Sequence, residues 1–447
     1  MRLLFDVDDQ FLARAAWSRI AEPGDADASR LVQAVGPSEA LRWLAGRADR
    51  AAAEPGDAGF WETQSADAWG PPAEPDGAGQ RVERLDSGGS AGPDGKGRDE
   101  GRDKGTGEGV DRAVARWLPR LADLEPAREL RALATLGGRL LCPGGPSWPD
   151  ALDDLGDMAP ICLWARGRGE VLATLGERLA TAVAVVGSRA STAYGETVTG
   201  RITADLVGWG VGIVSGGAFG IDAAAHRAAL AAGGFTVAVM AGGVDRLYPA
   251  GNERLLNAVV AEGAVVSELP LGGAPRRERF LARNRLIAAL GAVTVVTESG
   301  WRSGAHRTAR DAAALLRPVA AVPGPVTAAS SAGCHRLIRE GVATLVTGSD
   351  EIRELMAPLG LAPIPELATP QGPLDGMRPA DRQVFDALPK TRGAPVTSIV
   401  AASGLAAHDV MGALGRLERS GRAVTAGGLW RRTRPAPTLA RGQGGAR

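Results

Sequence analysis

Residues 182–187 (AVAVVG) and 211–216 (VGIVSG) are two short, continuously apolar runs separated by a stretch of helical length. Five further runs follow at similar spacing: 235–243 FTVAVMAGG, 264–268 AVVSE, 292–299 AVTVVTES, 318–324 PVAAVPG and 343–348 ATLVTG. Strands that are apolar at every position are buried on both faces, as in a parallel sheet covered by helices. The pattern predicts an α/β domain with a doubly wound, mainly parallel sheet over residues 139–358. Ligands of such sheets bind beyond the carboxyl ends of the strands, so the residues just after each run form the candidate site.

The segments before the sheet differ sharply in composition. Residues 1–50 and 111–138 have apolar residues at helical spacing and predict an N-terminal helical domain in two parts. Between them, residues 51–110 hold 14 glycines, 5 prolines and 13 acidic residues but only three aliphatic residues. This segment cannot bury enough apolar surface to offset the ordering of its backbone, so we expect a disordered acidic insertion. Residues 139–164 are proline-rich and predict a connector that leads into the sheet domain.

The segments after the sheet predict a small separate unit. A proline-containing linker covers residues 359–376, and residues 377–433 show two or three helical stretches followed by two short strands around Gly427 and Gly428. This order resembles a winged helix, and we expect the tail at 434–447 to be disordered. The unit carries nine basic and four acidic side chains. Docking of a protein partner and binding of duplex DNA both remain open for it.

Bulk composition excludes several classes of protein. The 51 basic and 51 acidic side chains cancel, so net charge indicates no partner. Three cysteines without CxxC spacing exclude a disulfide scaffold and argue against a thiolate zinc site. The N-terminus is not a signal peptide, and no stretch reaches the ~18 apolar residues of a membrane span. We therefore expect a cytoplasmic protein.

The loop after the first run contains Gly187, Ser188 and Arg189. A glycine turn that leads into a helix presents backbone N–H groups and the positive end of a dipole, which suit a phosphate. An arginine adds a fork of donors at the same place. The alternative interpretation is a tight turn with an exposed arginine.

The loop after the second run contains Ser215, Gly216 and Ala218, small residues that allow another backbone to approach closely. Asp222 follows, and we expect it to cap the next helix rather than act as a general base. We expect His226, one helical turn later, to be structural. Glu268 closes the fourth run, where we expect a carboxylate to brace a neighbouring loop or an arginine rather than to act in acid–base catalysis.

Residues 276–285, RRERFLARNR, are the most informative segment. Five arginines surround Phe280, in a chain with only seven phenylalanines. Arginines that follow a phosphate backbone and an aromatic ring that stacks on a base are the two parts of a groove for single-stranded nucleic acid. The alternative is a solvated helix start with Phe280 tucked into the core. The chain has no P-loop or HExxH motif, so the pattern favours a binding protein over a hydrolase of those classes.

Taken together, these segments resemble the DNA-processing protein A (DprA/Smf) family. The resemblance covers residues 139 to about 356 and rests on eight motifs in one order: VAVVGSRAST-YGE, VSGGAFGIDAAAH, TVAVMAGGVDRLYP, VVSELP, RFLARNRLIAAL, VTESGWRSGAHRTA, AVPGPV and SAGCHRLI. The family implies an extended Rossmann-like fold that binds single-stranded DNA, helps load the RecA recombinase in natural transformation and recombination, and forms a homodimer through this domain. It implies no catalytic residues, metal or cofactor.

By this resemblance, Gly187, Ser188 and Arg189 would hold a DNA phosphate and Phe280 would stack on a base. Ser215, Gly216 and Ala218 would lie opposite. The positively charged pocket would be lined by Arg283, Asn284 and Arg285.

Two departures from the family pattern concern Ala282, where the family usually has proline, and the stretch 333–336 (GCHR), where many members have a Gly-Thr-Asn run. A nucleophilic role for Cys334 with His335 is disfavoured, because adjacent side chains on a helix point about 100° apart.

Two enzymatic alternatives belong to other functional classes. One is a nucleotide-binding or nucleotide-cleaving enzyme related to the phosphoribohydrolase superfamily, whose PGGxGTxxE motif supplies a glutamate that this chain lacks after Gly304. The other is a dinucleotide oxidoreductase, which the absence of GxGxxG and of a ribose-binding acid disfavours.

Overall fold

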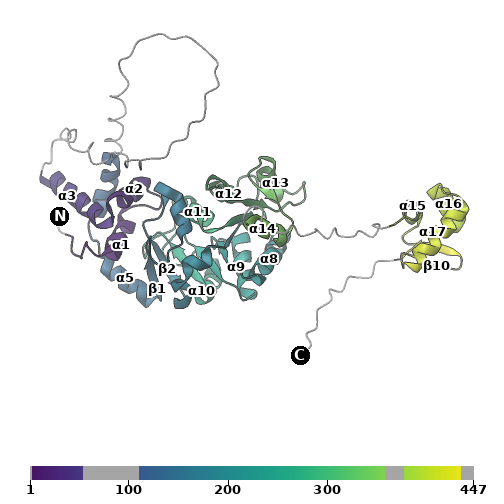
Figure 1. The fold of residues 1–447 in the computed structure, drawn as a ribbon, viewed down its shortest axis with the longest axis horizontal. Coiled ribbons are helices and arrows are strands. Elements are labelled where there is room, and N and C mark those ends of the chain that lie inside the picture. The colour runs from purple at the N-terminus through teal and green to yellow at the C-terminus, as the bar shows by residue number, and fades with distance from the viewer. Residues whose placement is uncertain (1–2, 54–109, 358–376, 434–447) are drawn as a thin grey trace, which may run out of the picture. The chain divides into compact units, whose positions relative to one another are not determined.

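The computed structural model describes residues 3–53, 110–357 and 377–433, and the chain divides into two compact units, Met1–Pro363 and Ile364–Arg447 (Figure 1). The disorder predicted for 51–110 lies almost entirely outside the described residues, as do the predicted linker and tail. Residues 51–53 end helix α3 and residue 110 begins the next helix.

The first unit is built on a nine-stranded sheet. Its strand order is β1-β2-β6-β5-β4-β3-β7-β8-β9. The strands from β6 to β9 in this order are parallel, whereas β2 is antiparallel to both β1 and β6. The bounds are β1 Gly138–Leu141, β2 Leu163–Gly167, β3 Val183–Val186, β4 Ile213–Ser215, β5 Thr236–Val239, β6 Ala264–Ser267, β7 Val293–Val296, β8 Val319–Ala321 and β9 Thr344–Leu345. The predicted mainly parallel, doubly wound sheet is confirmed. The segment 139–164 is more than a connector, because most of β1 and the first residues of β2 lie in it.

The strand order reverses between β3 and β7. From β3 the chain first builds outward through β4, β5 and β6, and then returns to place β7, β8 and β9 on the other side. Such a reversal leaves a crevice at the carboxyl ends of the strands, where doubly wound folds bind their ligands. Sheet topology therefore selects the edge beyond β3 and β7 as the place to search for a site.

Helices cover both faces of the sheet (Figure 1). Along β3, Ala184 and Val186 pack into one apolar core while Val183 and Val185 pack into another, so the strand is buried on both sides. One face carries α6 Gly169–Ala173, α7 Leu175–Leu179, α11 Arg277–Leu290, α12 Ala305–Ala314 and α13 Ala332–Arg339. The other face carries α8 Ala193–Gly208, α9 Ile221–Ala231, α10 Glu253–Glu262 and α14 Ser349–Met356.

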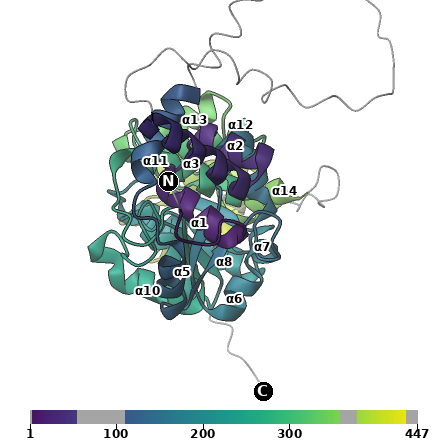
Figure 2. The same ribbon diagram turned by 90° about the vertical axis from the view of Figure 1, so that its left-hand side faces the viewer.

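A group of helices packs at one end of this unit (Figure 2). It contains α1 Gln10–Ile20, α2 Ala26–Val35, α3 Pro37–Ala53, a helix over 110–117, the 3₁₀ turn Leu118–Arg120 and α5 Pro126–Thr135. Asp9 caps α1 by accepting the N–H groups of Phe11 and Leu12. The core of the group is centred on Trp17 and Trp117, whose rings meet edge to face with centroids 5.4 Å apart.

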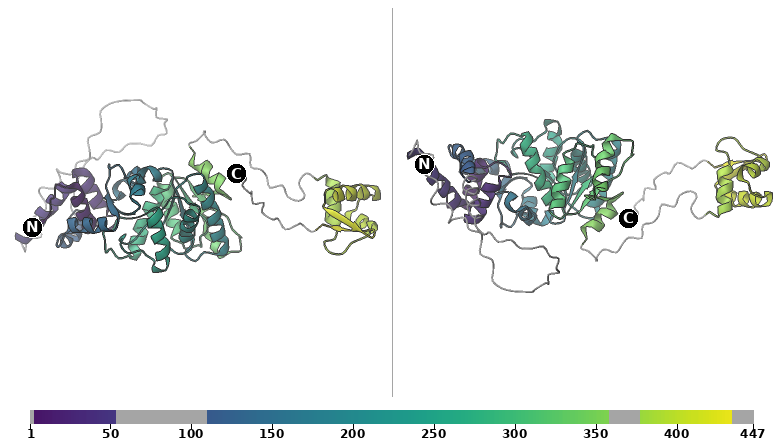
Figure 3. Two further views of the ribbon diagram at one scale, coloured as in Figure 1. Left: turned by 90° about the horizontal axis from the view of Figure 1, so that it is seen from below. Right: turned by 90° about the horizontal axis from the view of Figure 1, so that it is seen from above.

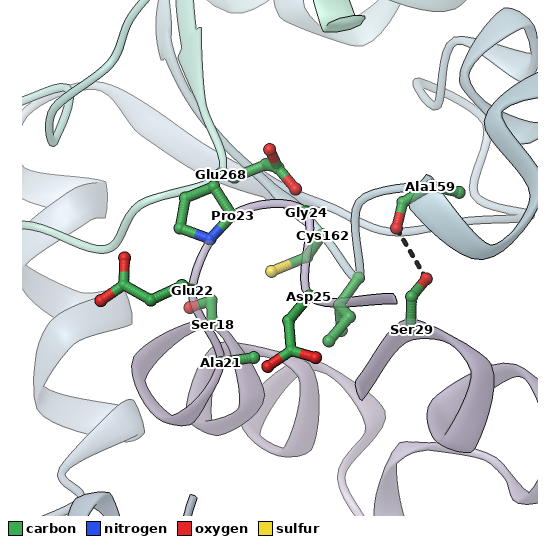
Figure 4. Close-up of a pocket in the computed structure, with 11 residues that line it drawn as sticks. Ser18, Ala21, Glu22, Pro23, Gly24, Asp25, Ser29, Ala159, Cys162 and Glu268 are labelled. Carbon is green, nitrogen blue, oxygen red and sulfur yellow. Dashed lines mark hydrogen bonds between the residues drawn. The ribbon is translucent and has the colours of Figure 1, made fainter. Parts of the chain in front are cut away.

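Polar contacts fix these helices to the sheet. The indole N–H of Trp164 in β2 donates to Ser18 Oγ at 3.0 Å, and Ser29 Oγ donates to the carbonyl of Ala159 at 2.7 Å. The junction leaves a small, partly open hollow of about 20 Å³, and Figure 4 shows Ser18, Cys162 and Glu268 on its wall. This space holds no more than a water-sized group. The helical group and the sheet therefore form one packed body.

The second unit contains α15 Pro379–Ala387, α16 Val396–Ser403, α17 Ala407–Arg419 and the antiparallel strands β10 Ala423–Ala426 and β11 Leu429–Arg432 (Figure 3). Gly427 and Gly428 both have positive φ, as a two-residue hairpin turn requires. Val384, Leu414 and Trp430 belong to its apolar core. The unit thus has three helices and a hairpin around a core of its own.

Among the described residues, no single helix has both the length and the apolar composition of a membrane span. The bent pair Val396–Ser403 and Ala407–Arg419 meets that test only when the two helices are joined across a 107° break.

Trp17→Ala should lower the free energy of unfolding by about 3–5 kcal/mol, because it removes a fully buried indole and leaves a cavity. Urea denaturation followed by far-ultraviolet circular dichroism measures the change. Phe11→Ala is the matched control, since Phe11 lies on the same helix but is 53% exposed. Equal losses in the two variants would contradict the assignment of Trp17 to the core.

Candidate functional site

An open cavity of about 730 Å³ lies at the carboxyl edge of the sheet, at the point where the strand order reverses. Its walls come from the segments that follow β3, β4, β5, β6 and β7. The lining includes Gly187, Ser188, Arg189, Ala218, Asp222, Tyr248, Arg276, Arg277, Phe280, Arg283, Asn284 and Arg302. We call this cavity the switch-point pocket. Residues up to 120 positions apart in the sequence therefore meet at the place that the topology selects.

The loop after β3 approaches its neighbours closely. A Cβ on Gly187 would lie 2.6 Å from the carbonyl oxygen of Glu298, so only glycine fits there. The N–H of Ser188 donates to that same carbonyl at 2.8 Å, and the carbonyl of Ser188 accepts the N–H of Ile221. The expectation of a free backbone N–H at Ser188 is thus corrected, because neighbouring loops already use it. Arg189, whose side chain is exposed, is the group in this loop that can reach an anion.

Glu298, at the end of β7, holds the start of α8. Its carboxylate accepts the N–H of Thr192 at 2.8 Å and the hydroxyl of Thr192 at 2.7 Å. Gly195 leaves room for this carboxylate, since a Cβ there would lie 2.2 Å from Glu298 Oε2. The side chain is almost completely buried. Glu298 therefore braces the loop that carries Arg189, a role that was not predicted from the sequence.

The loop after β4 is held from within the protein. Asp222 accepts the N–H of Ala218 at 3.3 Å, and the amide of Asn252 donates to the carbonyls of Gly217 and Ala218. Asp222 is therefore not the helix cap that the sequence predicted, because the capping position of α9 is Gly220. Gly220 has φ +76°, and a Cβ there would lie 2.2 Å from the carbonyl of Ser188. The two loops are packed against each other.

Ser215 is the last residue of β4 and is completely buried. Its hydroxyl donates to the carbonyl of Val185 at 2.7 Å, which links β4 to β3 below the pocket. The prediction that Ser215 faces a ligand is corrected accordingly. Gly216, the next residue, presents its carbonyl to Arg283 rather than to the open cavity.

Helix α11 has two different faces. Residues 277, 280, 284 and 287 follow helical spacing and all line the switch-point pocket. Arg279 faces the N-terminal helices instead, where its Nε lies 2.9 Å from the carboxylate of Glu22. The five arginines around Phe280 are thus divided between a ligand-facing side and a side that packs on the protein.

Arg285 belongs to the second side. Both of its terminal nitrogens lie 2.6 Å from the carboxylate oxygens of Glu268, and its Nε donates to the carbonyl of Met158. The side chain is buried. The prediction that Arg285 lines the positively charged pocket is therefore wrong: a bidentate ion pair and neighbouring carbonyls occupy its guanidinium group. The sequence-based expectation that Glu268 braces an arginine agrees with this contact.

Arg283 lines the pocket but is only 4% exposed. It donates to the carbonyls of Gly216, at 2.7 Å, and Val239. Burial lowers the pKa of Arg283 to about 10, and nearby Asp222 works against that change. For Asp222 burial has the opposite effect and raises the pKa, while the positive charge of Arg283 opposes this rise. Arg283 therefore fixes the pocket floor and supplies a buried positive charge beneath it.

Phe280 and Tyr248 form an aromatic pair on the pocket wall, with ring centroids 5.8 Å apart and planes 55° apart. The guanidinium carbon of Arg189 lies 5.1 Å from the Phe280 centroid, and that of Arg283 lies 5.9 Å from it. Phe280 is partly exposed and Tyr248 is 47% exposed, so neither ring is tucked into the core. Tyr248 was not among the site residues predicted from the sequence. Its rarity could have indicated it, because the chain has only two tyrosines.

Arginines without a carboxylate partner surround this aromatic pair. Within the described part of the chain, no ion pair involves any of four exposed arginines of the lining: Arg189, Arg276, Arg277 and Arg302. The acidic side chain in the lining is Asp222, which faces Arg283. The pocket is therefore strongly positive although the whole chain is neutral.

Side chains that suggest catalysis are engaged elsewhere. His226 is completely buried with Nδ1 2.8 Å from Thr236 Oγ1, and burial lowers its pKa to about 3. Burial raises the pKa of the Cys334 thiol to about 12, while His335 Nε2 lies 3.1 Å from the carbonyl of Gly324. No group of three or more metal-ligating side chains occurs among the residues that the structure describes.

The family model and the curated relatives point to the same family. Residues 139–357 match the model for DNA recombination-mediator protein A. A protein of Mycobacterium tuberculosis with the name DNA processing protein DprA is 46% identical over 334 residues, which cover 72% of this chain and 83% of that protein. The X-ray structure of DNA processing protein A from Streptococcus pneumoniae is 32% identical, covers 56% of this chain and 90% of that chain, and has a TM-score of 0.48. The structure of the Helicobacter pylori protein, which concerns its single-stranded DNA binding mode, is 29% identical, covers 46% of this chain and 91% of that chain, and has a TM-score of 0.42.

Arg285→Met should lower the free energy of unfolding by about 3–5 kcal/mol, because it leaves the carboxylate of Glu268 buried without its partner. Arg277→Met, on the exposed first turn of the same helix, should change it by less than about 0.5 kcal/mol. Thermal or urea denaturation measures both. The double variant Arg285→Met/Glu268→Gln should recover part of the loss, and an equal loss in Arg277→Met would contradict the division of α11 into two faces.

Proposed function

Because this chain belongs to the DprA/Smf family, we propose that its switch-point pocket binds single-stranded DNA. The observation that carries the proposal is the set of four exposed arginines around the Phe280–Tyr248 pair, none of them in an ion pair with a described carboxylate. Phosphate groups attract arginine side chains, and bases stack on aromatic rings. The pocket therefore offers both parts of a single-strand groove in one place.

In this proposal, side chains rather than backbone groups hold the phosphates. The N–H of Ser188 is already bonded to Glu298, so Arg189 provides the donors of the β3 loop. In the unbound protein its guanidinium group lies over the Phe280 ring. When a strand enters, a base takes that position on the ring and Arg189 turns to a phosphate. Gly187, Gly216 and Ala218 keep the neighbouring backbone small enough for the strand to approach.

Arg283 and Asn284 complete the floor of the binding site. Arg283 acts as a fixed buried charge, since its donors are directed at protein carbonyls. Arg285 takes no part in binding and instead positions α11 through Glu268. In this assignment the exposed Arg276, Arg277 and Arg302 contact phosphates, in place of Arg283 and Arg285.

The family resemblance extends the proposal to partners and process. The protein would act in the cytoplasm, protect incoming or recombining single strands, and help to load RecA in transformation and recombination. It would form a homodimer through the sheet domain and would not be an enzyme. The proposals that RecA is a partner and that the protein forms a homodimer rest on the family resemblance alone.

We propose further that the second unit is a winged helix, because three helices precede a two-stranded hairpin. The guanidinium group of Arg416 in α17 lies 2.6 Å from the Asp381 carboxylate in α15, so one basic residue of the candidate recognition helix is used within the unit. This reduces the charge available for a phosphate backbone and favours docking of a protein partner.

The enzymatic alternative is a nucleotide-cleaving relative of the phosphoribohydrolases. It requires a carboxylate free to assist cleavage at the pocket. Asp222 is bonded to a loop N–H and faces Arg283, and both oxygens of Glu298 are bonded to Thr192. These contacts favour DNA binding. Release of adenine from AMP by the purified protein would instead support the enzyme.

Phe280→Ala should weaken binding of a fluorescent oligothymidylate by about 1–3 kcal/mol, because one base loses its stacking partner. Fluorescence anisotropy measures the affinity, and Phe280→Tyr should retain it. Phe235→Ala is the matched control, because Phe235 is also partly buried beneath an arginine, Arg178, but lies at the other edge of the sheet. Unchanged affinity in a folded Phe280→Ala protein would exclude the stacking role.

Affinity should fall with salt at a slope of about −0.7 in log–log form for each phosphate neutralised, and so about −3 if all four exposed arginines take part. Arg189→Ala should flatten the slope by about 0.7, whereas Arg189→Lys should preserve the charge but not the bidentate geometry. Anisotropy titrations at several salt concentrations measure the slope. A slope that Arg189→Ala leaves unchanged would place this side chain outside the phosphate path.

A further inference from the structure

Trp301 lies on the rim of the switch-point pocket, in the loop that follows β7. It is 52% exposed, and its neighbours on both sides, Gly300 and Arg302, line the pocket. About half of this large indole therefore stays exposed to water. Its place between two lining residues puts it directly beside the pocket.

A cation–π contact holds the ring of Trp301. The guanidinium carbon of Arg336, from α13, lies 4.8 Å from the ring centroid. The Nε of Arg336 is in turn 2.7 Å from the carboxylate of Glu340, which also pairs with Arg310 of α12 at 2.7 Å. This network fixes the indole through a cation–π contact yet leaves half of its surface free. The arrangement repeats the Arg189–Phe280 contact inside the pocket.

The surroundings of Trp301 are basic. Residues 300–314 and 332–340 carry five arginines, Arg302, Arg307, Arg310, Arg336 and Arg339, against the two carboxylates Asp311 and Glu340, which pair with Arg307, Arg310 and Arg336. Arg302 also lines the switch-point pocket, so the two positive regions are continuous. A protein partner would need apolar area around the indole, whereas arginines interleaved with an aromatic ring suit a nucleic acid.

We propose that Trp301 is a second base-stacking site, on which the same DNA strand rests after it leaves the switch-point pocket. The proposal rests on the proposed function, since it extends the path of the strand from Phe280 across Arg302 to Trp301. The Arg336 guanidinium group backs the indole, and the exposed Arg302 and Arg339 neutralise the phosphates beyond the rim. Strands long enough to reach the rim therefore bind more tightly than strands that fill the pocket alone.

Two oligothymidylates, of about 6 and about 25 nucleotides, test this path by fluorescence anisotropy. Trp301→Ala should weaken binding of the long strand by about fivefold to 100-fold, the range expected for one lost base stack, and should affect the short strand much less. Trp301→Phe should retain most of the long-strand affinity. Phe280→Ala should weaken both strands.

Trp209→Ala is the matched control. Trp209 is 41% exposed and has the guanidinium carbon of Arg353 4.4 Å from its ring, but it follows α8 at the amino edge of the sheet. Its replacement should leave both affinities unchanged. A second measurement uses the wild-type protein: photocrosslinking of long strands that carry 5-iododeoxyuridine at successive positions should label peptides with Phe280 and with Trp301 from different positions.

The outcomes separate this proposal from the proposed function. If Phe280→Ala weakens binding while Trp301→Ala leaves the long strand unaffected and no crosslink reaches Trp301, the second stacking site is overturned and the indole serves another contact, such as a protein partner. If the wild-type protein binds neither strand, the proposed function fails and this proposal fails with it.

Discussion

The buried guanidinium group of Arg283 is the contact on which the candidate site depends. From α11 it reaches the carbonyl of Gly216, beyond β4, and the carbonyl of Val239, at the end of β5, and it faces Asp222 of α9. Carbonyls at the carboxyl ends of parallel strands lack a strand partner, and burying them without one is costly. The Arg283 side chain provides the hydrogen-bond donor for such a carbonyl at the ends of two strands, β4 and β5. It also fixes the distance between α11, which carries Phe280, and the loops that face it.

Around that contact, the loops of the pocket are bonded to one another rather than left free. The carboxylate of Glu298 accepts the N–H of Thr192, and the backbone of Ser188 is hydrogen-bonded to Glu298 and to Ile221. The side-chain amide of Asn252 donates to the loop after β4. A ligand therefore meets a preformed wall and loses little affinity to the ordering of loops. The exposed arginines are the adaptable part of the surface. A rigid wall that carries exposed arginine side chains favours attraction of a nucleic-acid backbone without regard to its base sequence.

Much of the fold is visible in the sequence because short, continuously apolar runs that alternate with helical stretches indicate strands buried on both faces. The strand order cannot be predicted from the sequence, since it depends on which strands pair across the sheet. The antiparallel strands β1 and β2 were not predicted, because they lie in or beside a proline-rich segment. The site was half visible. The composition of residues 276–285 identified a basic aromatic segment, but the separation of Arg283 from Arg285 required the partners Gly216 and Glu268, which are distant in the sequence. Tyr248 was missed because its role comes from the ring it meets, not from its neighbours.

The two faces of α11 give this helix a fixed rotational phase. One face presents Phe280 to the pocket, while Arg279 and Arg285 on the other are paired with Glu22 and Glu268. Each residue inserted in a helix turns everything beyond it by about 100°. A single residue inserted or deleted between Phe280 and Arg285 would therefore turn the ring relative to the Arg285–Glu268 ion pair, so that one of the two would be misplaced. The spacing of these two residues within α11 is for this reason as strict a requirement as their identity, and natural variation between them should consist of substitutions and not of insertions.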